Sequence, residues 1–167
     1  LRLFNCGFGD LASREYDLYP DHLQAEIDDL NAEIYPKLNN GVYRSGFATT
    51  QISYEEAVRD VFTMLDTLEQ RLANRRFLCG EQLTEADIRL FVTLVRFDAA
   101  YHGLFKCNLR KLAEYPNLDR YLQHILDIPG VRETVNIDHI KQGYYSIKAL
   151  NPNGIVPAGP DLSTYGL

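Results

Sequence analysis

The chain has 167 residues, 46% of them hydrophobic, and a formal net charge of −6. This composition predicts one globular domain, because a chain of this size buries roughly two-thirds of its unfolded surface. No block of Lys or Arg stands out, which argues against nucleic acids and anionic membranes as partners. The uninterrupted hydrophobic stretches are only a few residues long, too short to span a bilayer.

The cysteines and histidines show no spacing typical of metal ligands. Cys6, Cys79 and Cys107 lie far apart and form no C-x-x-C pair. An odd number of isolated thiols is typical of a reducing compartment, so we expect a cytoplasmic protein without a metal. Each cysteine is interpreted as structural or inert, since free Cys is among the most buried residue types. The chain starts at Leu1 without a Met, and its first residues, LRLFNCGFGD, suggest a fragment of a longer protein.

The apolar residues recur with a helical period along nearly the whole chain. This period predicts one helix over residues 21–38, behind Pro20, and a long helix over residues 53–75. The two apolar seams are Leu23, Ile27, Leu30, Ile34 and Leu38, and Val58, Val61, Leu65, Leu68 and Leu72. The second seam spans little more than two heptads, which favours a bundle within one chain over a long coiled coil.

The segment GEQLTEADIRLFVTLVRFDAAY, residues 80–101, predicts the central helix of the domain. Thr84 is interpreted as its N-cap: the hydroxyl accepts from the backbone N–H of Asp87, whose carboxylate reaches back to the Thr84 N–H. The helix is apolar almost all round, so we expect it to be buried. Gly103 is expected to stop it. Its polar stripe consists of Arg89, Thr93 and Arg96.

Two further helices complete the predicted fold. Pro116 opens one helix, which ends near the sequence DIPG, and a short last helix covers residues 138–147. Residues 150–167 are rich in Pro and Gly and are interpreted as an irregular tail. No strand series and no internal repeat is visible. The sequence therefore predicts an all-α helical bundle.

Tyrosine is the residue type that suggests a site. The chain has 11 Tyr and no Trp, whereas CGFG is far short of a nucleotide-binding loop and no hydrolase or metalloprotease motif is present. Tyr43 follows the turn-like NNG, Tyr101 closes the central helix, and Tyr144 lies in QGYY. A single tyrosine at such a place is usually an amphipathic residue at the edge of the core. Three of them at element ends make a site plausible as well.

The Thr84-x-x-Asp87 box at the start of a buried helix resembles the C-terminal helical domain of cytosolic glutathione transferases. More specifically, an ordered set of segments from about Arg2 to Pro160 resembles the glutathionyl-hydroquinone reductases, the Xi class. These segments are NNGVYRSGFATTQ, LTEADIRLFVTLVRFDAAY, FKCN, YPNL, TVNIDHIKQGYY and NPNGIVPAGP. The resemblance implies one glutathione-transferase C-terminal-like domain over residues 1–167, with an interdomain lead-in over 1–20. It also implies that the family's N-terminal thioredoxin-like domain is absent from this chain.

For the activity, the resemblance implies removal of glutathione from glutathionyl-hydroquinones. In that family a cysteine of the N-terminal domain attacks the thioether sulfur, and a mixed disulfide with glutathione forms. Free hydroquinone leaves, and a second glutathione resolves the enzyme. Glutathione is thus expected as a cosubstrate, bound mainly by the missing domain, together with an aromatic quinol substrate. Cys6, Cys79 and Cys107 do not match the family's catalytic cysteine motif. The resemblance also implies a homodimer through this domain.

The resemblance places three tyrosines in the site. Tyr43 resembles the family's proton donor to the departing hydroquinone, and Tyr101 and Tyr144 resemble a pair that lowers the pKa of the nucleophilic thiol. Phenol hydroxyls that donate to a thiolate favour its charged form. The adjacent Tyr145 is an alternative to Tyr144. Two other functions stay open: a general glutathione S-transferase domain and a non-catalytic helical interaction domain. A repressor's ligand-sensing domain is disfavoured because no basic recognition helix is visible.

Overall fold

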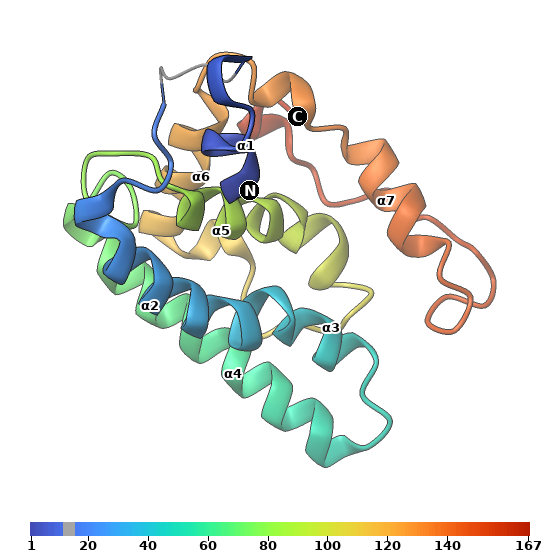
Figure 1. Ribbon diagram of the computed structural model, residues 1–167. Coiled ribbons are helices and arrows are strands. Elements are labelled where there is room, and N and C mark those ends of the chain that lie inside the picture. The colour runs from blue at the N-terminus through green and yellow to red at the C-terminus, as the bar shows by residue number, and fades with distance from the viewer. Residues whose placement is uncertain (12–15) are drawn as a thin grey trace.

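The computed structural model describes residues 1–11 and 16–167, and within these residues the secondary structure is helical, with no strand. This confirms the predicted all-α class. Figure 1 shows the helices gathered around α5, with α7 at one side of the bundle. The chain begins with a short helix α1, Arg2–Cys6, which the sequence did not predict. The side chain of Cys6 lies outside the described residues.

The helix predicted over residues 21–38 is interrupted and then continues further than expected. A 3₁₀ turn, Asp21–Leu23, leads into α2, Gln24–Ile34, and a wide π-helical turn, Tyr35–Asn39, follows. The widening coincides with Pro36, which has no N–H to donate and whose ring disfavours the regular helical hydrogen bond. The N–H of Asn40 instead reaches the carbonyl of Tyr35, at 2.8 Å.

The segment NNG is not a turn before Tyr43, as its composition suggested. Helix α3, Gly41–Gly46, begins directly after Asn40, and Tyr43 lies inside it. Gly41 is required here by a close approach, because an added Cβ would lie 2.9 Å from a methyl of Val61 on the next helix. The composition pointed to a turn because the need for a small residue against α4 is a tertiary constraint that single-sequence patterns do not carry.

The next helices follow the predicted order. Helix α4, Gln51–Arg71, is capped by the Thr50 hydroxyl and continues as a 3₁₀ turn, Leu72–Asn74, so the expected range of 53–75 is shifted by two residues at its start. Helix α6, Pro116–Leu126, starts at the predicted proline, where the Glu69 carboxylate accepts from the N–H groups of Asn117 and Leu118. The buried seam of α4 is Val58, Val61, Leu65 and Leu68.

Helix α5, Glu85–Arg96, is the buried centre of the domain, as predicted, and it carries the predicted capping box. The Asp87 carboxylate accepts the N–H of Thr84 at 2.8 Å, and the Thr84 hydroxyl donates to the same oxygen at 3.0 Å. The other carboxylate oxygen accepts the N–H of Leu78 at 2.8 Å and the hydroxyl of Tyr121 at 2.9 Å. Burial raises the pKa of Asp87, and the four donors act in the opposite direction.

The end of α5 differs from the expectation that Gly103 stops it. The helix widens into a second π-helical turn, Phe97–Tyr101, in which the N–H of His102 donates to the carbonyl of Phe97 at 2.8 Å. Gly103 does not adopt a left-handed conformation. An added Cβ at Gly103 would lie 2.8 Å from the hydroxyl of Tyr145, so glycine serves a close approach between this turn and α7.

Helix α7, Ile137–Tyr145, starts one residue before its predicted range and ends two residues earlier, and the Asn136 side chain caps it. It packs against the turn at residues 97–101. The segment beyond it is largely irregular, apart from a 3₁₀ turn, Ser163–Tyr165, and it returns to the bundle through the buried Leu162 and Tyr165. No helix in the described part of the chain is long and apolar enough to cross a membrane.

We predict that Asp87 contributes more to stability than the cap residue Thr84. Asp87→Ala should lower the free energy of unfolding by about 3 kcal/mol, because two buried backbone N–H groups lose their acceptor at roughly 1–3 kcal/mol each. Thr84→Ala should cost about 0.5–2 kcal/mol, as for other helix caps. Urea denaturation of the two variants measures both. Thr50→Ala at the exposed start of α4 is the control cap, and an Asp87→Ala loss no larger than that of Thr50→Ala would contradict the prediction.

Candidate functional site

The hydroxyl groups of Tyr43, Tyr101 and Tyr144 meet in one hydrogen-bonded cluster. Tyr144 stands in the middle, with its oxygen 2.6 Å from that of Tyr43 and 2.7 Å from that of Tyr101. Tyr43 comes from α3, Tyr101 from the π-helical turn after α5, and Tyr144 from α7. Residues up to 101 positions apart in the chain are thus brought to one point. We call this group the tyrosine cluster.

The ring of Phe105 supports all three tyrosines. It stacks on Tyr101, with centroids 5.3 Å apart and 24° between the planes, and it meets Tyr43 and Tyr144 edge-on at 5.2 and 5.7 Å. Aromatic pairs at such distances and tilts are favourable beyond the area that they bury. Phe105 itself is fully buried. The cluster therefore rests on a rigid aromatic base.

Three contacts hold the loop that carries Phe105. The Ser45 hydroxyl donates to the carbonyl of Phe105, and the Tyr54 hydroxyl donates to the carbonyl of Lys106, both at 2.8 Å. Lys106 adopts a left-handed conformation, with φ of 60°, which a side chain tolerates only where its surroundings impose it. A Cβ at Gly46 would lie 2.5 Å from the Phe105 ring, so only glycine lets α3 approach that ring.

The structure separates Tyr144 from its neighbour Tyr145. Tyr144 forms both bonds of the cluster, whereas the hydroxyl of Tyr145 lies at the turn around Gly103 and takes a hydrogen bond from the backbone of Leu104. Successive residues of a helix point about 100° apart, so only one of the two faces the cluster. The geometry selects Tyr144, and the catalytic role of the three tyrosines stays a prediction.

Tyr101 and Tyr144 remain protonated at neutral pH. Burial raises the pKa of Tyr101, and hydrogen bonds with its neighbours raise it further. Burial also raises the pKa of Tyr144 to about 12. Three phenols carry three protons, and the two mutual hydrogen bonds use two of them. One O–H is therefore left to donate out of the cluster, to a thiolate, a ring carbon or another acceptor.

A cleft of about 400 Å³ opens beside the tyrosine cluster. Val92 of helix α5 lines this cleft and is 43% exposed. Asn39, in the first π-helical turn, donates to Thr93 at 2.6 Å and so connects that turn to α5. The sequence reasoning missed most of this lining. The polar stripe of α5 was the available signal, because a stripe on a buried helix must face something polar. The lining residues are Tyr35, Asn39, Tyr43, Arg89, Val92, Thr93, Arg96, Tyr101 and Tyr144.

Cys79 and Cys107 do not line this cleft. Cys79 and Cys107 are buried, and burial raises the pKa of Cys107 to about 11, which disfavours the reactive thiolate. Cys6 was expected to be inert too, but its side chain lies outside the described residues. Within the described residues, no group of three or more His, Cys, Asp or Glu side chains is placed to hold a metal ion.

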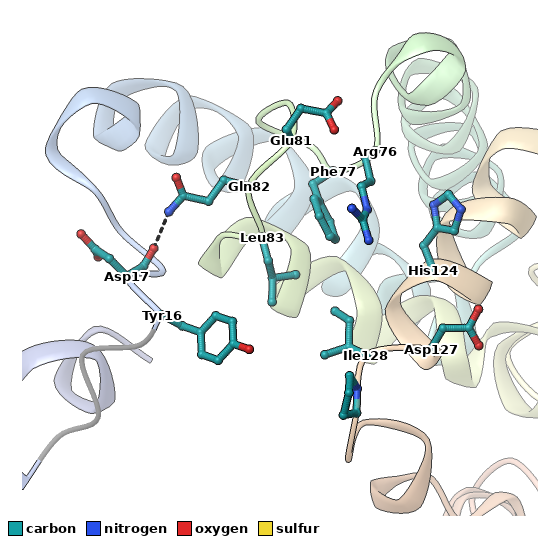
Figure 2. Close-up of a pocket in the computed structure, with 11 residues that line it drawn as sticks. Tyr16, Asp17, Arg76, Phe77, Glu81, Gln82, Leu83, His124, Asp127 and Ile128 are labelled. Atoms are coloured by element: carbon teal, nitrogen blue, oxygen red, sulfur yellow. Dashed lines mark hydrogen bonds between the residues drawn. The ribbon is translucent and has the colours of Figure 1, made fainter.

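A second hollow, of about 630 Å³, lies between the chain around Asp17, the turn before α5 and the end of α6 (Figure 2). There Gln82 donates to the carbonyl of Asp17 at 2.8 Å. Its charged lining is mixed, because Arg76 and the acidic Glu81 and Asp127 all line it. No cluster of hydroxyl groups lines it, so we assign the site to the tyrosine cleft.

Known proteins match this chain in sequence over nearly all of its length. The family described as glutathione S-transferase, C-terminal domain matches residues 51–124. Glutathionyl-hydroquinone reductase PcpF of Sphingobium chlorophenolicum is 53% identical over 100% of this chain and 54% of its own length. Glutathionyl-hydroquinone reductase YqjG of Escherichia coli is 51% identical over 96% of this chain and 49% of its own length. The chain thus spans about half the length of these relatives.

Solved structures agree with the sequence relatives. The glutathione-bound structure of YqjG from Escherichia coli superposes with a TM-score of 0.93 at 51% identity, over 96% of this chain and 52% of that one. A Xi-class glutathione transferase from Natrialba magadii gives 0.93 at 46% identity, over 96% of this chain and 50% of that one. The fold is therefore the C-terminal helical domain of the glutathione transferases. Within that superfamily, the chain belongs to the Xi class, with the glutathionyl-hydroquinone reductases.

We predict that Gly46 is needed for the packing of Phe105. Gly46→Ala places a methyl group 2.5 Å from the Phe105 ring, so the ring must move and the protein should lose about 1–3 kcal/mol of stability. Gly143→Ala in α7 is the matched control: its Cβ meets nothing within 4 Å, and it should stabilise the helix by about 0.5–1 kcal/mol. Thermal denaturation measures both. Equal effects of the two variants would contradict this view of the packing.

We also predict an alkaline loss of stability that depends on Tyr101. Its pKa in the folded state lies above the unfolded value of 10.0, so its contribution is complete below pH 10 and is lost as the pH rises above it. In Tyr101→Phe, the fall of the unfolding free energy with pH above 10 should be shallower by up to about 1.4 kcal/mol per pH unit. Urea titrations between pH 9 and 11 measure this slope, and an unchanged slope would contradict the prediction.

Proposed function

We propose that this chain is the substrate-binding half of a reductase that removes glutathione from glutathionyl-hydroquinones. The observation that carries the proposal is the tyrosine cluster, in which three phenols share two hydrogen bonds beside an open cleft. The relatives PcpF and YqjG, which are named for this activity, support it. Aromatic side chains around the cleft suit a flat quinol ring, which binds well against ring faces.

The first step needs a thiolate, which the family's thioredoxin-like domain supplies in the whole protein. One O–H of the tyrosine cluster is not used in the bonds within the cluster. It stabilises this thiolate by donating to it, and the bonds within the cluster strengthen that donation. The thiolate attacks the sulfur of the thioether, the new S–S bond forms, and the bond between sulfur and the ring carbon breaks. Its electrons stay on the ring, where a proton must follow.

Tyr43 gives this proton to the ring carbon. It is the most accessible member of the cluster, 38% exposed against 3% for Tyr101. The thiolate has by then become half of a mixed disulfide, so the O–H that stabilised it is free to act as the acid. The resulting phenolate takes the thiol proton of a second glutathione. That glutathione, now a thiolate, displaces the first one as glutathione disulfide and restores the enzyme thiolate.

The proposal also includes the cosubstrate, the oligomeric state and the compartment of the protein. Glutathione is the cosubstrate, held mainly by the thioredoxin-like domain, and the protein works as a homodimer in the cytoplasm. The resemblance to the Xi class supports the dimer. Two isolated, buried cysteines support a reducing compartment.

We predict that loss of Tyr43 mainly slows the proton transfer to the ring, whereas loss of Tyr101 mainly affects the thiolate, in the whole protein. Tyr43→Phe should slow release of the hydroquinone by about 10²- to 10⁴-fold, because it removes a general acid. Tyr101→Phe should raise the pKa of the nucleophilic thiol by about 1 unit or more, since it removes part of the bonded chain that supports the thiolate. Single-turnover kinetics and the pH dependence of thiol alkylation measure these two effects.

Tyr145→Phe is the matched control, because this residue takes part in none of the proposed steps and its hydroxyl lies outside the tyrosine cluster. It should leave both the release rate and the thiol pKa near the wild-type values. If Tyr43→Phe and Tyr145→Phe reduce glutathionyl-hydroquinones equally fast, the assignment of the acid is wrong. If the whole protein conjugates glutathione to electrophiles but reduces no glutathionyl-hydroquinone, the proposed function itself is wrong.

A further inference from the structure

The charge of the tyrosine cleft is opposite to that of the chain. The chain has a net charge of −6, yet the charged residues that line the cleft are Arg89 and Arg96, and no Asp or Glu of the described residues lines it. The two arginines lie on α5, seven residues apart and therefore two helical turns, or about 10 Å, along the same face. Such a cleft attracts an anionic group of a ligand.

Arg89 makes a long ion pair with a buried carboxylate. Its guanidinium lies 3.8 Å from Glu85, whose side chain is only 1% exposed. The same carboxylate oxygen accepts from Asn31 at 3.1 Å. The closer cation of that carboxylate is Arg2, whose guanidinium donates to the same oxygen at 2.9 Å. Arg89 thus shares one buried carboxylate with a second cation, whereas Arg96 lies outside this group.

Arg96 is in a different position. It donates one hydrogen bond, to the backbone carbonyl of Val92, and it forms no ion pair with any described residue. A guanidinium has five N–H donors, so most of them stay available on the cleft side. Arg96 lies close enough to Tyr144 for its charge to lower the pKa of that phenol, against the effect of burial. Its positive charge thus stands at the edge of the tyrosine cluster.

We propose that Arg96 is a subsite for a carboxylate of the bound glutathionyl-hydroquinone. The carboxylate belongs either to the quinol ring, as in a dihydroxybenzoate, or to the glutathionyl part. The bidentate geometry of a guanidinium suits a carboxylate, and the exposed Val92 one turn earlier provides an apolar surface for the ring. This inference rests on the proposed function, because it names the substrate class of the same site.

A purely structural role for Arg96 makes a different prediction. A basic residue in the last turn of a helix stabilises the helix dipole. In that case its replacement would lower stability without changing the preference among ligands. The test is therefore a ratio of affinities within one variant, which a uniform loss of stability does not alter.

The experiment uses the whole protein and compares the dissociation constants of hydroquinone and 2,5-dihydroxybenzoate by titration calorimetry. The wild type should bind the carboxylated ring at least about tenfold more tightly, as expected for a charge-assisted pair. Arg96→Gln should bring the ratio close to one, and Arg96→Lys, which keeps the charge, should retain part of the preference. Arg59→Gln, at an exposed arginine of α4, is the matched control and should keep the wild-type ratio.

The dissociation constant of glutathione, measured in the same variants, separates the two sources of the carboxylate. If Arg96→Gln weakens glutathione about tenfold and the ring carboxylate makes no difference, the subsite holds the glutathionyl carboxylate. If Arg96→Gln changes neither the ring ratio nor the glutathione affinity, the inference is overturned. Neither binding measurement requires turnover, so their results test the carboxylate subsite independently of the reductase activity.

Discussion

The buried Asp87 carboxylate is the interaction that anchors the central helix α5 to its neighbours. It accepts from the backbone of Leu78 and Thr84 and from two hydroxyl groups, and each of its oxygens takes two of these bonds. A carboxylate deprived of water costs several kcal/mol unless donors replace its hydration. Here fixed N–H and O–H dipoles do so. They join the turn before α5, the first turn of α5 and helix α6 to one point, which sets the direction of α5 through the core.

The direction of α5 in turn decides where the site forms. Both π-helical turns of the domain, Tyr35–Asn39 and Phe97–Tyr101, contribute residues to the cleft. Such turns are rare and often occur at functional sites, because the extra residue in the turn redirects the side chains that follow it. The first turn coincides with Pro36 and is tied to α5 through Asn39. The second turn brings the hydroxyl of Tyr101 to Tyr144 on α7.

The sequence allowed prediction of the features that short-range patterns determine. The capping box at Thr84, the buried centre at α5 and the start of α6 at Pro116 all depend on residues a few positions apart, and all were predicted correctly. The break at Pro36, the helix at Gly41 and the reason for Gly103 were missed. The break at Pro36 has a local cause that was overlooked. The helix at Gly41 and the role of Gly103 depend on contacts with distant elements, the methyl of Val61 and the hydroxyl of Tyr145. Propensity and period do not carry this information.

The same limit applies to the site. The three tyrosines were named from a family resemblance, whereas residue type and position alone favoured a core-edge role for each of them. Their convergence depends on packing through Phe105, which no spacing in the sequence indicates. Arg96 was visible as part of a polar stripe, but its freedom from an ion pair with the described residues becomes apparent only when the neighbours of α5 are in place.

The order of the hydroxyls in the cluster explains why proton transfer uses three hydrogen-bonded phenols rather than one. If Tyr101 donates to Tyr144 and Tyr144 to Tyr43, the remaining proton points outward from the most exposed of the three. Once Tyr43 has given that proton away, its oxygen already accepts from Tyr144, which already accepts from Tyr101. The negative charge is met by hydrogen bonds that need no reorientation, which is the condition for effective stabilisation of a developing charge. A single buried phenol would lack that support, and its raised pKa would make the transfer slower.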